Sequence, residues 1–219
     1  MRTIINNGGG IHMKKTNKTN SPCTQCLDTQ CHYVFEADPF LEWLVGILGP
    51  VMLGAKPAEI LSFNHCEIDQ QEKLKKIDLY FAQCFKMKMR RIPYPCGTVR
   101  ILFYHPMSLE KALSDRRNLK FLKTMDYPDV YALEDYLDVL IEKMSDCKIP
   151  HEIGVFLGYP LKDVIGFMGD TRLKHAKTRG WRVYGDPRVS DAKFEEIQEA
   201  KCEIKTLLLT NHPLEIILN

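Results

Sequence analysis

Large apolar residues recur at helical spacing along much of the chain. The clearest series runs from Leu74 through Ile77 and Phe81 to Phe85, which predicts an amphipathic helix over about 68–90. The same spacing and the positions of Pro, Gly and capping residues predict four more helices, at about 39–48, at about 107–123, at about 130–145, and from Ser190 or Asp191 to Leu208.

Strand patterns are fewer and shorter than the helical ones. The strongest is Thr98–Tyr104 (TVRILFY), which is rich in β-branched and aromatic residues. Shorter strands are expected at Ile60–Phe63 and at Trp181–Tyr184, and the latter ends at the turn signal Gly185-Asp186-Pro187. The pattern therefore predicts an α+β fold, in which a small sheet packs with several helices.

One segment, 151–167 (HEIGVFLGYPLKDVIGF), combines reactive side chains, glycines and apolar anchors. Gly154, Gly158 and Val164 have the spacing of a helix-turn-helix, so a helix-turn-helix-like hairpin is expected near 151–168. In its second helix, Lys162 is the only basic side chain that could contact bases in a DNA major groove, and the neighbouring Asp163 would repel the phosphates. The favoured interpretation is a packing hairpin, with DNA as a weakly supported partner.

Composition narrows the class of protein. The chain has 219 residues, 45% hydrophobic and 26% charged, which suits a single globular domain over 33–219. Residues 1–32, basic and cysteine-containing, are expected to be disordered. The net charge of +2 does not by itself indicate a nucleic-acid or membrane partner. The longest apolar stretch, Trp43 to Ala55, is too short to cross a bilayer, and the N-terminus lacks a signal core, so a cytoplasmic location is expected.

Four segments resemble a single bacterial family. They are LGPVMLGAKPAEILSF, the strand led by Cys96-Gly97-Thr98, the HEIG-x-FLGYP-x-x-DV-x-GF signature, and GWRVYGD. Over about 38–205 the chain resembles an uncharacterised domain of unknown function that is common in clostridia-like anaerobes. The resemblance implies a cytoplasmic bacterial protein and supplies no activity.

A cysteine–histidine site is one alternative function. Cys96, His151 and either Asp163 or Asp170 follow the chain order of papain-like hydrolases, in which an imidazole lowers the pKa of a thiol and a third group orients the ring. Such a site would make the protein a hydrolase or a transferase that uses Cys96 and His151. Cys96 precedes a strand rather than opening a helix, which makes a packing role the simpler interpretation. Whether the protein is an enzyme therefore stays open at this point.

A metal- or redox-linked function is a second alternative. Cys23, Cys26, Cys31 and His32 lie within ten residues of one another, and Cys-x-x-Cys can bind one zinc or iron ion. No second such pair follows, so an exposed, oxidisable segment is the simpler interpretation.

A ligand pocket is the third possibility. Trp181, Arg182 and Tyr184 alternate along a strand and could form a wall beside Tyr159. Glu152 and Asp186 complete the predicted ligand-binding set, and the competing interpretation is an edge strand anchored by Trp181. Taken together, the sequence favours a non-enzymatic regulatory or ligand-binding protein built around 151–167.

Overall fold

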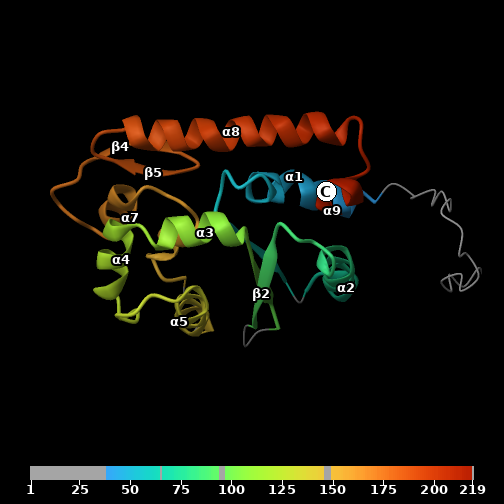
Figure 1. Ribbon diagram of the computed structural model, residues 1–219, viewed down its shortest axis with the longest axis horizontal. Coiled ribbons are helices and arrows are strands. Elements are labelled where there is room, and N and C mark those ends of the chain that lie inside the picture. Colours follow the sequence, from blue (N-terminus) through green and yellow to red (C-terminus); the bar gives the residue numbers. More distant parts are fainter. Residues whose placement is uncertain (1–37, 65, 94–96, 146–148, 219) are drawn as a thin grey trace, which may run out of the picture. The chain divides into compact units, whose positions relative to one another are not determined.

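The computed structural model describes residues 38–64, 66–93, 97–145 and 149–218. Within these ranges the chain is an α+β fold with nine helices and two small antiparallel sheets (Figure 1). In chain order the elements are α1 (Pro39–Met52), β1 (Ala58–Phe63), α2 (Gln70–Phe81), β2 (Lys88–Pro93), β3 (Val99–Tyr104), α3 (Pro106–Leu113), α4 (Arg116–Lys123), α5 (Leu133–Ser145), α6 (Ile153–Phe156), α7 (Leu161–Phe167), β4 (His175–Arg179), β5 (Trp181–Tyr184), α8 (Arg188–Leu208) and α9 (Pro213–Leu218).

The larger sheet separates two hydrophobic cores. Its strand order is β1-β3-β2, and the central strand β3 pairs antiparallel on both sides. Successive side chains of a strand point to opposite faces. Accordingly Ile101 and Phe103 enter one core, whereas Leu102 and Tyr104 enter the other, and all four are buried. This two-sided burial explains why β3 reads as the strongest strand in the sequence.

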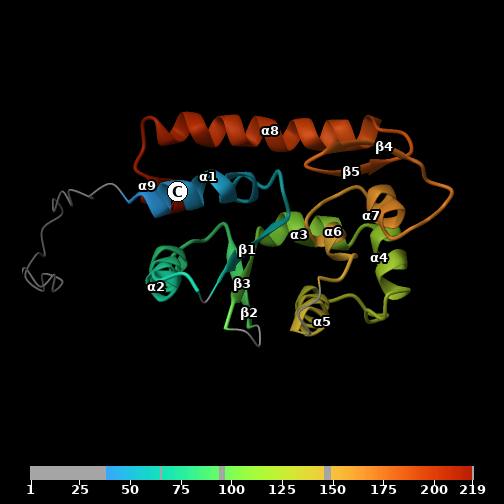
Figure 2. The same cartoon turned by 180° about the vertical axis from the view of Figure 1, so that it is seen from behind.

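Different helices complete the two cores. Side chains of α1, α2, α8 and α9 pack with Ile101 and Phe103, and side chains of α3 to α7 pack with Leu102 and Tyr104. Figure 2 shows α2 on one side of the sheet and α5 on the other. The α6–α7 region, where the candidate site lies, therefore packs on the second core, on the Leu102 and Tyr104 face of β3.

Helix α1 continues past the end that Gly49-Pro50 predicts. It runs to Met52, because Val51 and Met52 bury their side chains in the first core. Gly49 lets α8 approach closely, since a Cβ there would lie 2.3 Å from Cγ1 of Ile204. A packing contact thus overrides the local signal for a helix end.

The helix expected over 68–90 is wrong in its second half. Helix α2 ends at Phe81, Phe85 is 91% exposed, and the chain returns as β2 to pair with β3. The alternation in β2 is obscured by Arg90 and Arg91, whose guanidinium groups pair with carboxylates on neighbouring helices. Long-range pairing with a buried strand outweighs helical periodicity here.

The remaining differences concern short elements. The helix expected over 107–123 is two helices, because Asp115 accepts hydrogen bonds from the backbone amides of Arg117 and Asn118 and begins α4. Strand β4 and helix α9 carry no clear sequence signal. The strand at Trp181–Tyr184 is confirmed as β5.

The predicted disordered segment 1–32 lies outside the described residues. Within the described part of the chain, no helix is both long enough and apolar enough to span a membrane.

Candidate functional site

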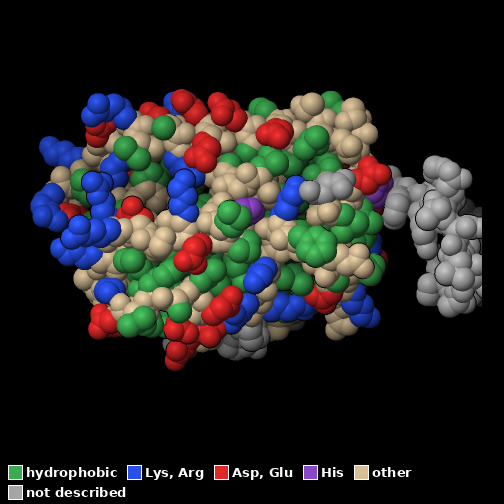
Figure 3. Space-filling view, in the orientation of Figure 1, with side chains coloured by type: hydrophobic (Ala, Val, Ile, Leu, Met, Phe, Trp, Pro, Cys, Tyr) green, Lys and Arg blue, Asp and Glu red, His purple; other side chains and the backbone are tan. Residues whose placement is uncertain are grey.

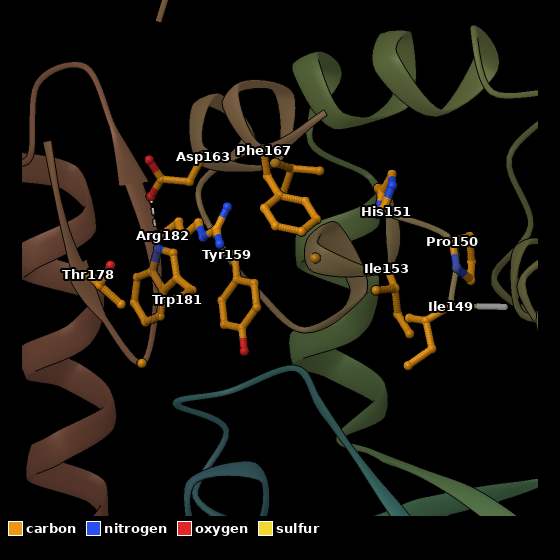
Figure 4. A pocket seen from close by; sticks show the side chains of 13 residues that line it. Ile149, Pro150, His151, Ile153, Tyr159, Asp163, Phe167, Thr178, Trp181 and Arg182 are labelled. Atoms are coloured by element: carbon orange, nitrogen blue, oxygen red, sulfur yellow. Dashed lines mark hydrogen bonds between the residues drawn. The ribbon is translucent and has the colours of Figure 1, made fainter. Parts of the chain in front are cut away.

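A pocket of about 530 Å³ opens between the 149–154 segment, α7 and the β4–β5 ribbon. Figure 4 shows the Tyr159, Trp181 and Phe167 side chains around it, with His151 and Ile153 on the far side. Most of the lining side chains are apolar or aromatic. The helix, strand and loop that form it come from the second half of the chain.

Glycine brings α6 and α7 together at this pocket. A Cβ on Gly154 would lie 2.8 Å from Cγ2 of Val164, so a larger residue would push the two helices apart. At Gly158, between the helices, φ is +80° and a Cβ would lie 2.4 Å from Cδ of Pro57. Gly154 therefore allows the close approach of the two helices, and Gly158 allows both a close approach and a left-handed turn.

Aromatic rings form two walls of the pocket. The Tyr159 ring stacks on the Trp181 ring, with centroids 4.8 Å apart and planes 19° apart. Phe167 is 47% exposed, and its ring forms a T-shaped contact with the His151 ring at a centroid distance of 5.1 Å. Burial raises the pKa of Tyr159 to about 12, so its hydroxyl stays neutral. The pocket thus offers flat, uncharged surfaces to a ligand.

A buried carboxylate, Asp163, fixes the Trp181 wall. Its two oxygens accept four hydrogen bonds, from Lys162 Nζ at 2.6 Å, the Tyr184 amide at 2.8 Å, Trp181 Nε1 at 2.9 Å and Ser190 Oγ at 2.6 Å. Burial raises the pKa of Asp163, but these donors outweigh it and hold the pKa below the ordinary 3.8. The indole is therefore held in one orientation by an ionised group.

Lys162 extends this network to two more elements. Its ammonium also donates to the Tyr184 carbonyl and to Ser190 Oγ, each at 2.7 Å. In the same helix, the backbone of Gly166 packs directly against the Tyr184 side chain. A Cβ at position 166 would lie 2.4 Å from Cγ of Tyr184. The network joins α7, β5 and the first turn of α8.

Arg182 is the cation on the pocket wall. Its side chain is exposed, and its guanidinium carbon lies 5.7 Å from the centroid of the Phe167 ring. Across the described ranges, no carboxylate forms an ion pair with Arg182. The guanidinium can therefore donate to an anionic group of a ligand.

The structure brings together half of the predicted ligand-binding set. Tyr159, Trp181 and Arg182 line the pocket. Three other members lie elsewhere. Glu152 is buried and pairs with Lys143 at 2.9 Å, Tyr184 packs on Gly166 and His175, and Asp186 binds Arg188.

Only part of the predicted catalytic set can be placed. Cys96 lies outside the described residues. His151 is exposed at the pocket. Among the described residues, Asp163 accepts hydrogen bonds from the four donors named above and forms none with His151. In Figure 4 the two side chains lie at opposite ends of the pocket. The cysteine–histidine enzyme stays a prediction.

The predicted metal set, Cys23, Cys26, Cys31 and His32, also lies outside the described residues. In the part of the chain that the structure covers, no group of three His, Cys, Asp or Glu side chains could hold a metal ion.

The hairpin near 151–168 consists of two very short helices. Helix α6 is a single turn of four residues, and α7 has seven. The basic residue of α7, Lys162, is bound to Asp163, and Phe167 is its one exposed residue. The arrangement fits a packing hairpin that lines a pocket better than a helix presented to a DNA groove.

Sequence reasoning missed three residues of the site. Phe167 is the last residue of the signature segment, and its aromatic side chain could have suggested a place in the pocket. Ser190 was expected only as a possible helix cap, whereas α8 begins at Arg188 and the Ser190 hydroxyl donates to Asp163. The role of Lys162 gave no signal, because two of its three partners, Tyr184 and Ser190, are 22 and 28 residues away.

Comparison with known proteins gives a family without an activity. No curated protein matches the chain, and no solved structure matches it. One family profile matches residues 44–218, which is most of the chain and includes the whole pocket. The chain therefore belongs to the family described as "Protein of unknown function (DUF3793)".

Proposed function

We propose that the pocket binds a small organic ligand with a flat apolar part and one anionic group, and that the protein is a non-enzymatic ligand-binding regulator. The observation that carries the proposal is Arg182, a cation that lies on the wall of a largely apolar pocket and has no carboxylate partner among the described residues. The volume of about 530 Å³ lies within the range typical of small-molecule sites.

The rigidity of the pocket supports binding. Trp181 is held by Asp163 and by stacking on Tyr159, so little side-chain entropy is lost when a ring packs against it. Phe167 is partly exposed and offers a second aromatic surface. A ring between these surfaces would place an attached carboxylate or phosphate near Arg182.

The network behind the wall supports a regulatory role. Asp163 binds both Trp181 and Ser190, so a ligand against Trp181 acts on the first turn of α8 through a single carboxylate. Helix α8 is 21 residues long and packs along α1. Occupancy of the pocket can thus bias the position of a long helix.

The proposal is tested by calorimetric titration with 2-naphthoate and with the neutral 2-naphthamide. From the size of the probe we expect a Kd for 2-naphthoate of about 1 mM or tighter. The amide should bind about tenfold more weakly, because it lacks the charge that Arg182 recognises. Arg182→Gln should remove this difference.

Arg188→Gln is the matched control. It removes an exposed guanidinium on the first turn of α8 that does not line the pocket. Equal affinities of the native protein for the two probes would contradict the proposed selectivity for an anion. If neither probe gives a heat of binding at millimolar concentration, the proposed ligand binding at this pocket is refuted.

A further inference from the structure

The positive charge of this chain is unevenly distributed. Overall, 30 Lys and Arg residues are nearly balanced by 28 Asp and Glu residues. Two segments depart from this balance. Residues 116–124 hold four basic and no acidic residues, and residues 171–185 hold five basic and no acidic residues. The rest of the chain is therefore net negative.

The fold brings these two segments to the same end of the described structure. In Figure 3, Lys and Arg side chains gather on the left, over the elements that Figure 1 labels α4, α7, β4 and β5. Helices α4 and α7 also border one hollow of about 570 Å³, to which Asn118 and Leu161 both contribute. In this view, basic residues far apart in sequence thus gather at one end of the molecular surface.

Helix α4 presents its charges on one side. Arg116, Lys120 and Lys123 are four and three residues apart, so they share a face, and all three are exposed. Leu122 is buried on the opposite side. Among the described residues, no carboxylate pairs with any basic side chain of α4.

Two basic side chains of the 171–185 segment are likewise free of ion pairs among the described residues. Lys174 and Arg182 are exposed and have no carboxylate partner within the described ranges. Their neighbours differ, because Lys177 binds Asp191 and Arg172 binds Asp170. In the part of the chain that the structure describes, cations without a carboxylate partner therefore lie both at the pocket, as Arg182, and on α4.

We infer that this surface binds single-stranded nucleic acid. The inference rests on the proposed function, since one base enters the aromatic pocket, and Arg182, Lys174 and α4 contact the phosphates of the same strand. Basic side chains along the backbone path, combined with aromatic surfaces for bases, are the recurring features of sites for single strands.

The aromatic recess distinguishes a single strand from two other polyanions. Bases within a duplex are stacked and cannot enter a pocket, whereas an unpaired base can be splayed out into one. An anionic membrane is contacted by apolar side chains that project into the lipid. Here Trp181 and Tyr159 instead line a hollow and stack on each other.

The test is fluorescence anisotropy of the full chain with a labelled uridine dodecamer at several salt concentrations. The test variant is the double substitution Lys120→Gln and Lys123→Gln, outside the pocket and on the solvent face of α4. At about 0.1 M salt each lost phosphate contact should cost about fivefold in affinity, so the variant should bind about 25-fold more weakly. The slope of log K against log salt should become shallower by about 1.4.

The control carries the same change of charge elsewhere. Lys75→Gln with Lys201→Gln alters two exposed lysines on α2 and α8. It should bind the dodecamer like the native protein, and 2-naphthoate should compete with the dodecamer for the native protein. Circular dichroism confirms that both variants are folded.

Each other outcome overturns the inference. If 2-naphthoate binds but the dodecamer binds no more tightly than uridine monophosphate, the proposed function stands and nucleic acid is excluded. Binding to phosphatidylserine vesicles without binding to the dodecamer identifies a membrane surface instead. Equal losses in the control and α4 variants show that charge alone, and not this surface, attracts the strand. Binding of neither 2-naphthoate nor the dodecamer refutes both proposals.

Discussion

Replacing Asp163 with Asn tests whether the buried carboxylate holds the pocket wall together. The substitution keeps the shape of the side chain but removes its charge and one of its two acceptor oxygens. One oxygen of Asp163 accepts from Lys162 and the Tyr184 amide, and the other accepts from Trp181 and Ser190. An asparagine can therefore satisfy only one of these pairs.

The less costly orientation keeps the oxygen toward Lys162 and the Tyr184 amide. The new NH2 group then faces Ser190, whose hydroxyl can rotate to accept, and Trp181, whose indole N–H is left without an acceptor. A buried unpaired donor costs about 1–3 kcal/mol, and Lys162 loses its ionic partner as well. We expect the free energy of unfolding to fall by about 3 kcal/mol, and Tm by about 6–12 °C for a domain of this size.

The assay is thermal and urea unfolding of Asp163→Asn, with Asp186→Asn as the control. Asp186 is exposed and, among the described residues, its carboxylate accepts hydrogen bonds from Arg188 alone, so its variant should melt like the native protein. The pKa of Asp163 is lowered in the folded protein, so its stabilisation is complete well above 3.8 and is lost as pH falls through the folded pKa. The difference between native and Asp163→Asn should therefore shrink in acid. A Tm of Asp163→Asn equal to that of the control would refute the role of this carboxylate.

Two further substitutions probe packing and burial by urea unfolding. Gly166→Ala would place a Cβ 2.4 Å from Cγ of Tyr184 and should lower the free energy of unfolding by about 2 kcal/mol, whereas Gly46→Ala, with nothing within 4 Å, should raise it by up to about 1 kcal/mol. Equal effects of the two would contradict the close approach of α7 and β5. Glu152→Gln removes the ionic partner of Lys143 and should cost about 2 kcal/mol, and a neutral result would show that the pair does not stabilise the second core.

Elements with strong local patterns could be predicted from the sequence. Strand β3 is apolar on both faces because it separates two cores, and that burial is visible in its composition. Strand β2 could not be predicted, because its Arg90 and Arg91 are satisfied by carboxylates from other elements. Its place in the sheet depends on pairing with a distant strand, which no local window contains.

The candidate site could be predicted only in part, because some of its residues stand out locally and others are brought in by tertiary packing. Tyr159 and Trp181 attract attention as aromatic residues beside glycines, and they do line the pocket. Three of the four partners of Asp163 could not be found, because they lie 18 to 27 positions away in the sequence and meet it through tertiary packing. Glu152 was expected at a ligand, but the fold turns it toward Lys143. A charged residue of the 151–167 segment can thus be a buried structural residue rather than a ligand contact.

The central claim is that the pocket beside Trp181 binds a flat, anionic ligand. The most direct measurement is a titration with 2-naphthoate followed by the two indole N–H signals in a ¹H–¹⁵N NMR spectrum, because the chain has two tryptophans. We predict that the Trp181 signal shifts and saturates, while the Trp43 signal, from a residue stacked on Phe40 in α1, stays in place. An unshifted Trp181 signal at saturating 2-naphthoate, or equal shifts of both signals, would contradict the claim.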